Sequence, residues 1–174
     1  MERVERSIDV DVPVRVAYDQ WTQFEEFPRF MEGVESVTQM TDEKIHWVAR
    51  VAGRRKEWDA HITEQEPDTH IAWMGFGDAD NMGRIAFEAL GPERTRITVA
   101  IDWEPQGAVE RAGDALGVLD RRVEGDLERF KGFVESRERP TGAWRGEIHD
   151  GREQRPGEDE LGATGTEDGG PLGP

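Results

Sequence analysis

The chain has 174 residues, with 22 Lys and Arg against 38 Asp and Glu, so its formal net charge is −16. A negative field of this size repels polyanions, which argues against a nucleic-acid partner and against anionic membrane surfaces. The chain has no Cys, which excludes disulfides, thiolate catalysis and Cys-ligated metal, and its length is typical of one domain with an appendage.

Targeting and membrane segments are not expected. The N-terminal residues lack the apolar stretch of a signal peptide, and no run approaches the roughly 18 apolar residues of a membrane span. We therefore expect a cytoplasmic protein without stable membrane insertion.

The first predicted elements are one strand and two short helices. Apolar residues from Val4 to Val12 alternate with polar ones, which predicts a half-buried strand that ends at Pro13. Helical spacing of apolar residues then predicts a helix over 14–21, and residues 24–30 form a second helical piece, broken near Pro28.

Six further strands are predicted, separated by short turn sequences that suit antiparallel hairpins. Several of these strands alternate so that one face is apolar and the other polar, as in a sheet with one buried face. The predicted strands cover residues 34–40, 44–51, 55–66, 70–75, 83–90 and 95–103.

The last predicted element is a long amphipathic helix. Apolar residues recur in steps of three and four from Val109 to Val134, and Pro140 follows the end of the pattern. The composition then changes: residues 141–174 hold nine Gly, three Pro and eight acidic residues, with few large apolar side chains. This composition predicts a domain over residues 1–140 and a disordered acidic tail over 141–174.

Several sequence motifs follow one another in a set order along the chain. The first two are Ser7-Ile-Asp-Val-Asp-Val-Pro-Val-Arg-Val-Ala-Tyr18 and Trp21-Thr-Gln-Phe24-Glu-Glu-Phe-Pro-Arg-Phe-Met31. The later ones are Trp58-Asp-Ala-His-Ile-Thr-Glu64 and residues 71–73, 83–87, 95–99 and 113–117. Together these motifs resemble the polyketide cyclase/dehydrase branch of the START-like (SRPBCC) superfamily, and the resemblance covers most of residues 4–138.

The resemblance implies an α+β helix-grip fold. In that fold a seven-stranded curved antiparallel sheet surrounds the long C-terminal helix, and two short helices follow the first strand. It further implies a deep apolar cavity between sheet and helix that binds lipids, polyketides, quinones or other hydrophobic molecules. The residue pattern is compatible with such a cavity. One sheet and one helix enclose a space that is filled only if bulky side chains pack into it.

The inward aromatic and apolar side chains are the candidate ligand-binding residues. Cavities for small molecules are lined mainly by such groups, and a solidly packed core is the alternative interpretation. The candidates are Trp47, Trp58, Ile62, Trp73, Phe76, Met82, Phe87, Trp103, Leu116, Leu119 and Val123. We expect the segments 24–31 and 76–82 to flank the mouth of the cavity.

Polar candidates are few. His61, Glu64 and Arg84 are the remaining candidates for proton transfer, although the alternation of its strand places His61 on the outward face. Arg122 lies at the edge of the helical stripe, where it either binds a ligand carboxylate or phenolate or faces solvent. No two His have metal-ligand spacing, and no phosphate-binding motif occurs, so neither a metal nor a cofactor is predicted.

These observations leave two main functional hypotheses. The first is a non-catalytic protein that binds a hydrophobic small molecule such as a lipid, a quinone or a polyketide-like compound. The alternative is an aromatase/cyclase that promotes aldol condensation and dehydration of a poly-β-ketone. A third hypothesis gives the acidic tail an interaction role, but the sequence identifies no protein partner for it.

Overall fold

The computed structural model describes residues 2–51, 53–77, 80–103 and 115–154. The order predicted from the sequence, a strand, two short helices, six strands and a long helix, is confirmed. The elements are β1 (Glu2–Val10), α1 (Val14–Trp21), the 3-10 helix η1 (Phe24–Arg29), β2 (Val34–Gln39), β3 (Lys44–Val51), β4 (Arg54–Glu66), β5 (His70–Gly77), β6 (Asn81–Gly91), β7 (Arg94–Trp103), α3 (Ala115–Glu135), β8 (Glu147–His149) and β9 (Arg152–Gln154).

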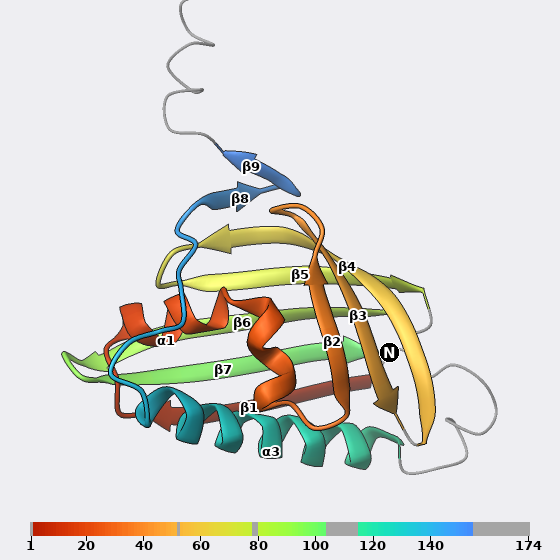
Figure 1. The fold of residues 1–174 in the computed structure, drawn as a ribbon, viewed down its shortest axis with the longest axis horizontal. Coiled ribbons are helices and arrows are strands. Elements are labelled where there is room, and N and C mark those ends of the chain that lie inside the picture. The colour runs from red at the N-terminus through yellow and green to blue at the C-terminus, as the bar shows by residue number, and fades with distance from the viewer. Residues whose placement is uncertain (1, 52, 78–79, 104–114, 155–174) are drawn as a thin grey trace, which may run out of the picture.

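The strands form one curved antiparallel sheet in the order β1-β7-β6-β5-β4-β3-β2. The first strand pairs with the last long one, so β1 is an edge strand of this sheet, and α3 contacts it. Figure 1 shows α1, η1 and α3 over the same face of the curved sheet. That face is the apolar one, because strand side chains alternate with period two.

One end of the molecule is solidly packed. Phe130 of α3 is fully buried, and its ring lies 4.8 Å from the ring of Trp21 and 5.2 Å from that of Phe30, centroid to centroid. Tyr18 packs edge-on against Phe87 at 5.3 Å. Such tilted and edge-to-face contacts between rings add to the stabilisation that comes from burying them.

Two strands come from the segment that the sequence predicted to be disordered. Among the described residues the sheet has nine strands rather than seven, because β8 pairs with β4 and β9 pairs with β8. Ile148 of β8 is fully buried opposite Gln65. The prediction of disorder is therefore wrong for residues 141–154, which we name the C-terminal strap, whereas residues 155–174 lie outside the described residues.

Polar contacts fasten the strap to α1 and to the β4–β5 turn. Thr141 exchanges two hydrogen bonds of 2.9 Å with the buried amide of Gln20. The Arg145 guanidinium pairs with Asp19 at 2.5 Å and with Asp68 at 2.8 Å. Because the Asp19 carboxylate is buried, Arg145 neutralises a charge that would otherwise be costly to keep there. Figure 1 shows the strap passing α1 on its way to β8.

The end of the strap is predicted to depend on pH. Hydrogen bonds to Glu147 and Glu64 raise the pKa of His149 above 6.5, and the Asp150 backbone N–H and His149 lower the pKa of Glu64 below 4.5. Below the pKa that His149 has in the unfolded chain, its stabilisation of the folded strap is complete, and it is lost as pH rises through the raised pKa of the folded state. The stabilisation by Glu64 is instead lost as pH falls through the lowered pKa of that carboxyl in the folded state. Hydrogen exchange, corrected for intrinsic rates, should therefore show more protection of residues 147–154 near pH 5.5 than near pH 8.

A His149→Gln variant is the control for that measurement. It should remove most of the difference in protection between the two pH values, while α3 exchanges as in the wild type. Equal protection of β8 and β9 at both pH values in the wild type would contradict the assignment to His149.

Candidate functional site

A cavity of about 520 Å³ lies between the sheet and α3. It is bounded by the inner faces of β3 to β7, by the α1–η1 region and by the N-terminal part of α3. Of its 25 described lining residues, four carry a charged or amide side chain, so the walls are overwhelmingly apolar. The lining residues are Trp21, Phe24, Phe27, Met31, Val34, Ile45, Trp47, Ala49, Val51, Lys56, Trp58, Ala60, Ile62, Ile71, Trp73, Asn81, Val99, Ile101, Trp103, Val118, Leu119, Arg122, Val123, Asp126 and Leu127.

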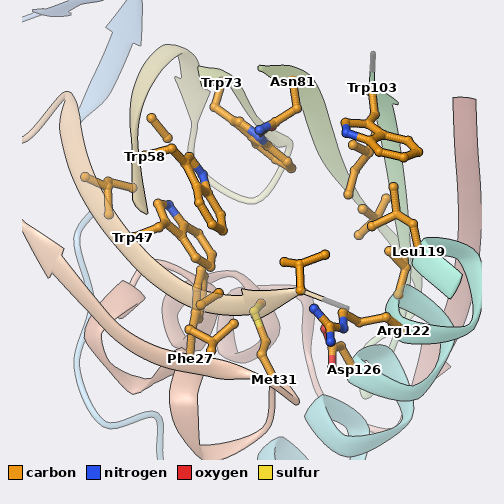
Figure 2. Close-up of a pocket in the computed structure, with 18 of the residues that line it drawn as sticks. Phe27, Met31, Trp47, Trp58, Trp73, Asn81, Trp103, Leu119, Arg122 and Asp126 are labelled. Carbon is orange, nitrogen blue, oxygen red and sulfur yellow. Dashed lines mark hydrogen bonds between the residues drawn. The ribbon is translucent and has the colours of Figure 1, made fainter. Parts of the chain in front are cut away.

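Stacked indoles form one wall. Trp47 and Trp58 are cross-strand partners on β3 and β4, and their rings are nearly parallel with centroids 5.6 Å apart. Phe27 of η1 lies 5.4 Å from Trp47 and continues this wall toward the helices. Figure 2 shows Trp47 and Trp58 on one side of the cavity and Trp103 and Leu119 on the other. Apolar side chains therefore line both sides of the cavity.

Trp73 occupies its place because its strand neighbour is a glycine. Trp73 pairs with Gly83 across β5 and β6, and an added Cβ at Gly83 would lie 2.1 Å from an indole carbon. The indole Nε1 donates a 3.0 Å hydrogen bond to Oδ1 of Asn81, which fixes the ring further. The position of this aromatic side chain therefore depends on a residue with no side chain of its own.

Replacing Gly83 by alanine should displace the Trp73 ring. We expect a loss of about 1–3 kcal/mol of stability in urea unfolding, typical of overpacking, together with a change in near-UV circular dichroism. Gly91→Ala on the same strand is the matched control, because nothing lies within 4 Å of its added Cβ. Equal effects of the two substitutions would contradict the role of Gly83.

The charged lining residues of α3 lie one helical turn apart. Arg122 donates a 3.1 Å hydrogen bond from Nη1 to the carbonyl of Arg50 on β3. Asp126 accepts hydrogen bonds at Oδ1 from the backbone of Glu32, 2.9 Å, and from Arg129, 2.5 Å. Burial nevertheless raises the pKa of Asp126 above its ordinary value. Figure 2 shows Arg122 and Asp126 at the opposite end of the cavity from Trp73 and Asn81.

Seven of the eleven ligand-binding candidates line the cavity. They come from four strands and from α3, and their role in binding stays a prediction. These residues are Trp47, Trp58, Ile62, Trp73, Trp103, Leu119 and Val123.

The other four candidates lie elsewhere. Phe76 is 55% exposed and Met82 is 40% exposed, on the outward-facing positions of β5 and β6. Phe87 points inward but packs against Tyr18 at the solid end. Leu116, in the first turn of α3, borders a shallow depression beside β1. None of these four residues is among those that line the cavity, and their role in ligand binding stays a prediction.

None of the three polar candidates is among the residues that line the cavity. His61 is exposed, and its Nε2 donates to the carbonyl of Gly151 at 3.1 Å. Arg84 is exposed on β6, between the inward-facing Gly83 and Ile85. Glu64 pairs with His149 at 3.0 Å, because a register shift after Ile62 turns Gln65 inward in its place. The candidates for proton transfer therefore face the strap or solvent.

Sequence reasoning missed three polar lining residues, although a signal existed for each. Lys56 lies two residues before Trp58, and Asn81 lies two residues before Gly83, so strand alternation places both on the inner face. Asp126 lies four residues after Arg122 and shares its side of α3.

Within the described residues, no group of three or more His, Asp or Glu side chains is placed to hold a metal ion. In the same part of the chain, no helix is long and apolar enough to span a membrane.

A curved antiparallel sheet that surrounds a long C-terminal helix, with an apolar cavity between them, defines a helix-grip protein of the START-like class. The family model described as "Polyketide cyclase / dehydrase and lipid transport" matches residues 10–131. The chain belongs to this family, as its sequence motifs indicated.

Comparison with known proteins agrees with this assignment. An uncharacterized 17.2 kDa protein from the melC2-rnhH intergenic region of Streptomyces lincolnensis is 49% identical over 149 residues, which cover 85% of this chain and 99% of that protein. The Zhui aromatase/cyclase from Streptomyces sp. R1128 is 18% identical with a TM-score of 0.68, over 82% of this chain and 99% of its own. A START superfamily protein from Mycobacterium smegmatis is 19% identical with a TM-score of 0.59, over 73% and 97%. At these identities the two solved structures show a shared fold.

Proposed function

We propose that this protein binds a hydrophobic small molecule, such as a lipid, a quinone or a polyketide-like compound, in the cavity between the sheet and α3. The observation that carries the proposal is the cavity itself, about 520 Å³ of space with aromatic and aliphatic walls. Cavities of about 300–1,000 Å³ with apolar walls and few polar groups are typical of small-molecule sites. The family's description, which includes lipid transport, supports the same function.

The free energy of such binding comes mainly from the apolar surface that the ligand removes from water. A ligand that buries about 300 Å² of apolar surface gains about 7 kcal/mol at roughly 25 cal/mol per Å². The ligand's loss of translational and rotational freedom on binding offsets at least about 4 kcal/mol of that gain. The Trp47 and Trp58 rings stack on each other and so restrict each other's motion, which lowers the cost of ordering that wall when a ligand binds.

Two measurements on the full chain test the proposal. Native mass spectrometry of protein purified under mild conditions should reveal a copurified apolar molecule or an empty chain. The neutral fluorophore N-phenyl-1-naphthylamine should then bind saturably, with one molecule per chain and energy transfer from the cavity tryptophans. An empty protein that takes up neither this probe nor any lipid, quinone or polyketide would overturn the proposal.

A second candidate function is that of an aromatase/cyclase, and Asp126 is the observation that favours it. Its carboxyl lines the cavity beside Arg122, and burial raises its pKa, which suits a group that exchanges protons with a bound ketone. The fold similarity to the Zhui aromatase/cyclase agrees with this candidate. If Asp126→Asn leaves the products formed from a reactive poly-β-ketone unchanged, this assignment is wrong.

A further inference from the structure

Arg122 is held on the cavity wall by contacts with the opposite layer of the protein. Its hydrogen bond to the Arg50 carbonyl joins α3 to β3. Gly33, with a φ of 77°, lies beside it, and an added Cβ there would be 3.1 Å from Nη2 of Arg122 and 2.8 Å from the Arg50 carbonyl oxygen. The guanidinium is therefore positioned by the Arg50 carbonyl, next to Gly33, rather than by an ion pair with a carboxylate.

Within the described residues Arg122 makes no ion pair, although it lies close enough to Asp126 for its charge to oppose the rise that burial causes in the pKa of that carboxyl. No carboxylate of that part of the chain lies within 4.0 Å of its guanidinium, whereas Arg129 pairs with the nearby Asp126 at 2.5 Å. Guanidinium has five N–H donors in a planar fork, and the carbonyl of Arg50 takes one of them. A second cationic side chain, Lys56, lines the cavity from β4, opposite Ala49.

An unpaired guanidinium on an apolar wall selects for a partner of opposite charge. Hydrogen bonds between a guanidinium and an anionic oxygen are about twice as strong as those between neutral groups. The carboxylate of Asp126, one helical turn away, is paired with Arg129 at 2.5 Å, which offsets its repulsion of an incoming anion.

We propose that Arg122 binds an anionic oxygen, a carboxylate or a phenolate, at one end of the hydrophobic ligand. The tryptophan walls then hold the apolar remainder of that molecule. This inference rests on the proposed function and narrows it, because it assigns the site to acidic amphiphiles in preference to neutral ones of equal size.

Two fluorophores with the same ring skeleton test the proposal on the full chain. The first is 1-anilinonaphthalene-8-sulfonate, which is anionic, and the second is the neutral N-phenyl-1-naphthylamine. Arg122→Gln should weaken binding of the anionic probe at least tenfold and change that of the neutral probe less than twofold. Arg121→Gln, one residue away on the exposed side of α3, is the matched control and should change neither.

The outcomes separate this inference from the proposed function. If the wild type binds both probes and Arg122→Gln binds the anionic one unchanged, the inference is wrong and the proposed function stands. If Arg122→Gln weakens binding of both probes equally, Arg122 stabilises the structure of the cavity and does not bind the anionic group. The inference is then again wrong. If the wild type binds neither probe and takes up no lipid, quinone or polyketide, the proposed function itself fails. Arg122→Lys keeps the positive charge but lacks the planar set of guanidinium donors. It should bind the anionic probe more tightly than Arg122→Gln and less tightly than the wild type.

Discussion

Replacing Ala60 by tryptophan should weaken binding of N-phenyl-1-naphthylamine at least 100-fold while leaving the protein folded. Ala60 is buried on β4, lines the cavity, and lies between Ile45 and Gly75 on the neighbouring strands. An indole added there occupies space that the ligand would need. Because that space is empty, the ring should enter it without the usual cost of overpacking, which is about 1–3 kcal/mol. Fluorescence titration and urea unfolding measure the two effects.

Ala72→Trp is the control for this prediction. Ala72 faces the other side of the same sheet, across from Arg84, so its indole should leave binding unchanged. Binding by Ala60→Trp at wild-type affinity would place the ligand outside the cavity. A loss of more than about 3 kcal/mol in Ala60→Trp would mean that the interior is solid, contrary to the structure.

Replacing Phe130 by alanine should lower the free energy of unfolding by about 3–5 kcal/mol, the range for deleting a large ring from a packed core. Phe130 is fully buried among Trp21 and Phe30, at the solid end of the molecule. Its neighbours are themselves held by further ring contacts, so they cannot close the space that the deletion leaves. Urea unfolding monitored by circular dichroism gives the value.

Leu119→Ala, three turns earlier on the same helix, provides the contrast. Leu119 is partly buried and borders the cavity, so its side chain has fewer packed neighbours to lose. We expect a loss of about 1 kcal/mol, well below the range for a packed leucine. If the two substitutions cost the same, α3 does not divide into a solid half and a half that faces a cavity.

The walls of the cavity were largely predictable from the sequence because strand alternation is a robust signal. Trp47, Trp58, Trp73 and Trp103 share one face, and each lies on the inner wall. The alternation fails where the register shifts: between Ile62 and Glu64 the bulge turns Gln65 inward and Glu64 toward the strap. A bulge of this kind leaves no clear mark in one sequence.

The extent of the cavity was less predictable, because a shared face does not fix which neighbour fills the space. Phe87 lies on the apolar face of β6, yet α1 crosses that part of the sheet and Tyr18 packs against its ring. Phe76 belongs to the outward face of β5, where its apolar character gave a misleading signal. Deciding such positions requires knowing where the helices lie on the sheet.

The C-terminal strap was missed because its composition was averaged with that of the residues beyond it. The strap contains a few anchoring side chains, Trp144, Arg145 and Ile148, among many small and polar ones. Arg145 pairs with Asp19 and Asp68, and Ile148 lies opposite Gln65, so these partners are between 77 and 126 residues apart in sequence. Long-range pairs of this kind leave no local periodicity, so composition alone indicated disorder.

Intermolecular NOEs between N-phenyl-1-naphthylamine and methyl groups of the chain show directly whether a hydrophobic ligand lies in the cavity. We expect contacts from the probe to methyl groups that surround the cavity, those of Ile62, Ile71, Val99, Leu119 and Val123. Contacts to the exposed Met74 and Met82 on the outer face instead, or the absence of any saturable contact, would contradict binding in the cavity.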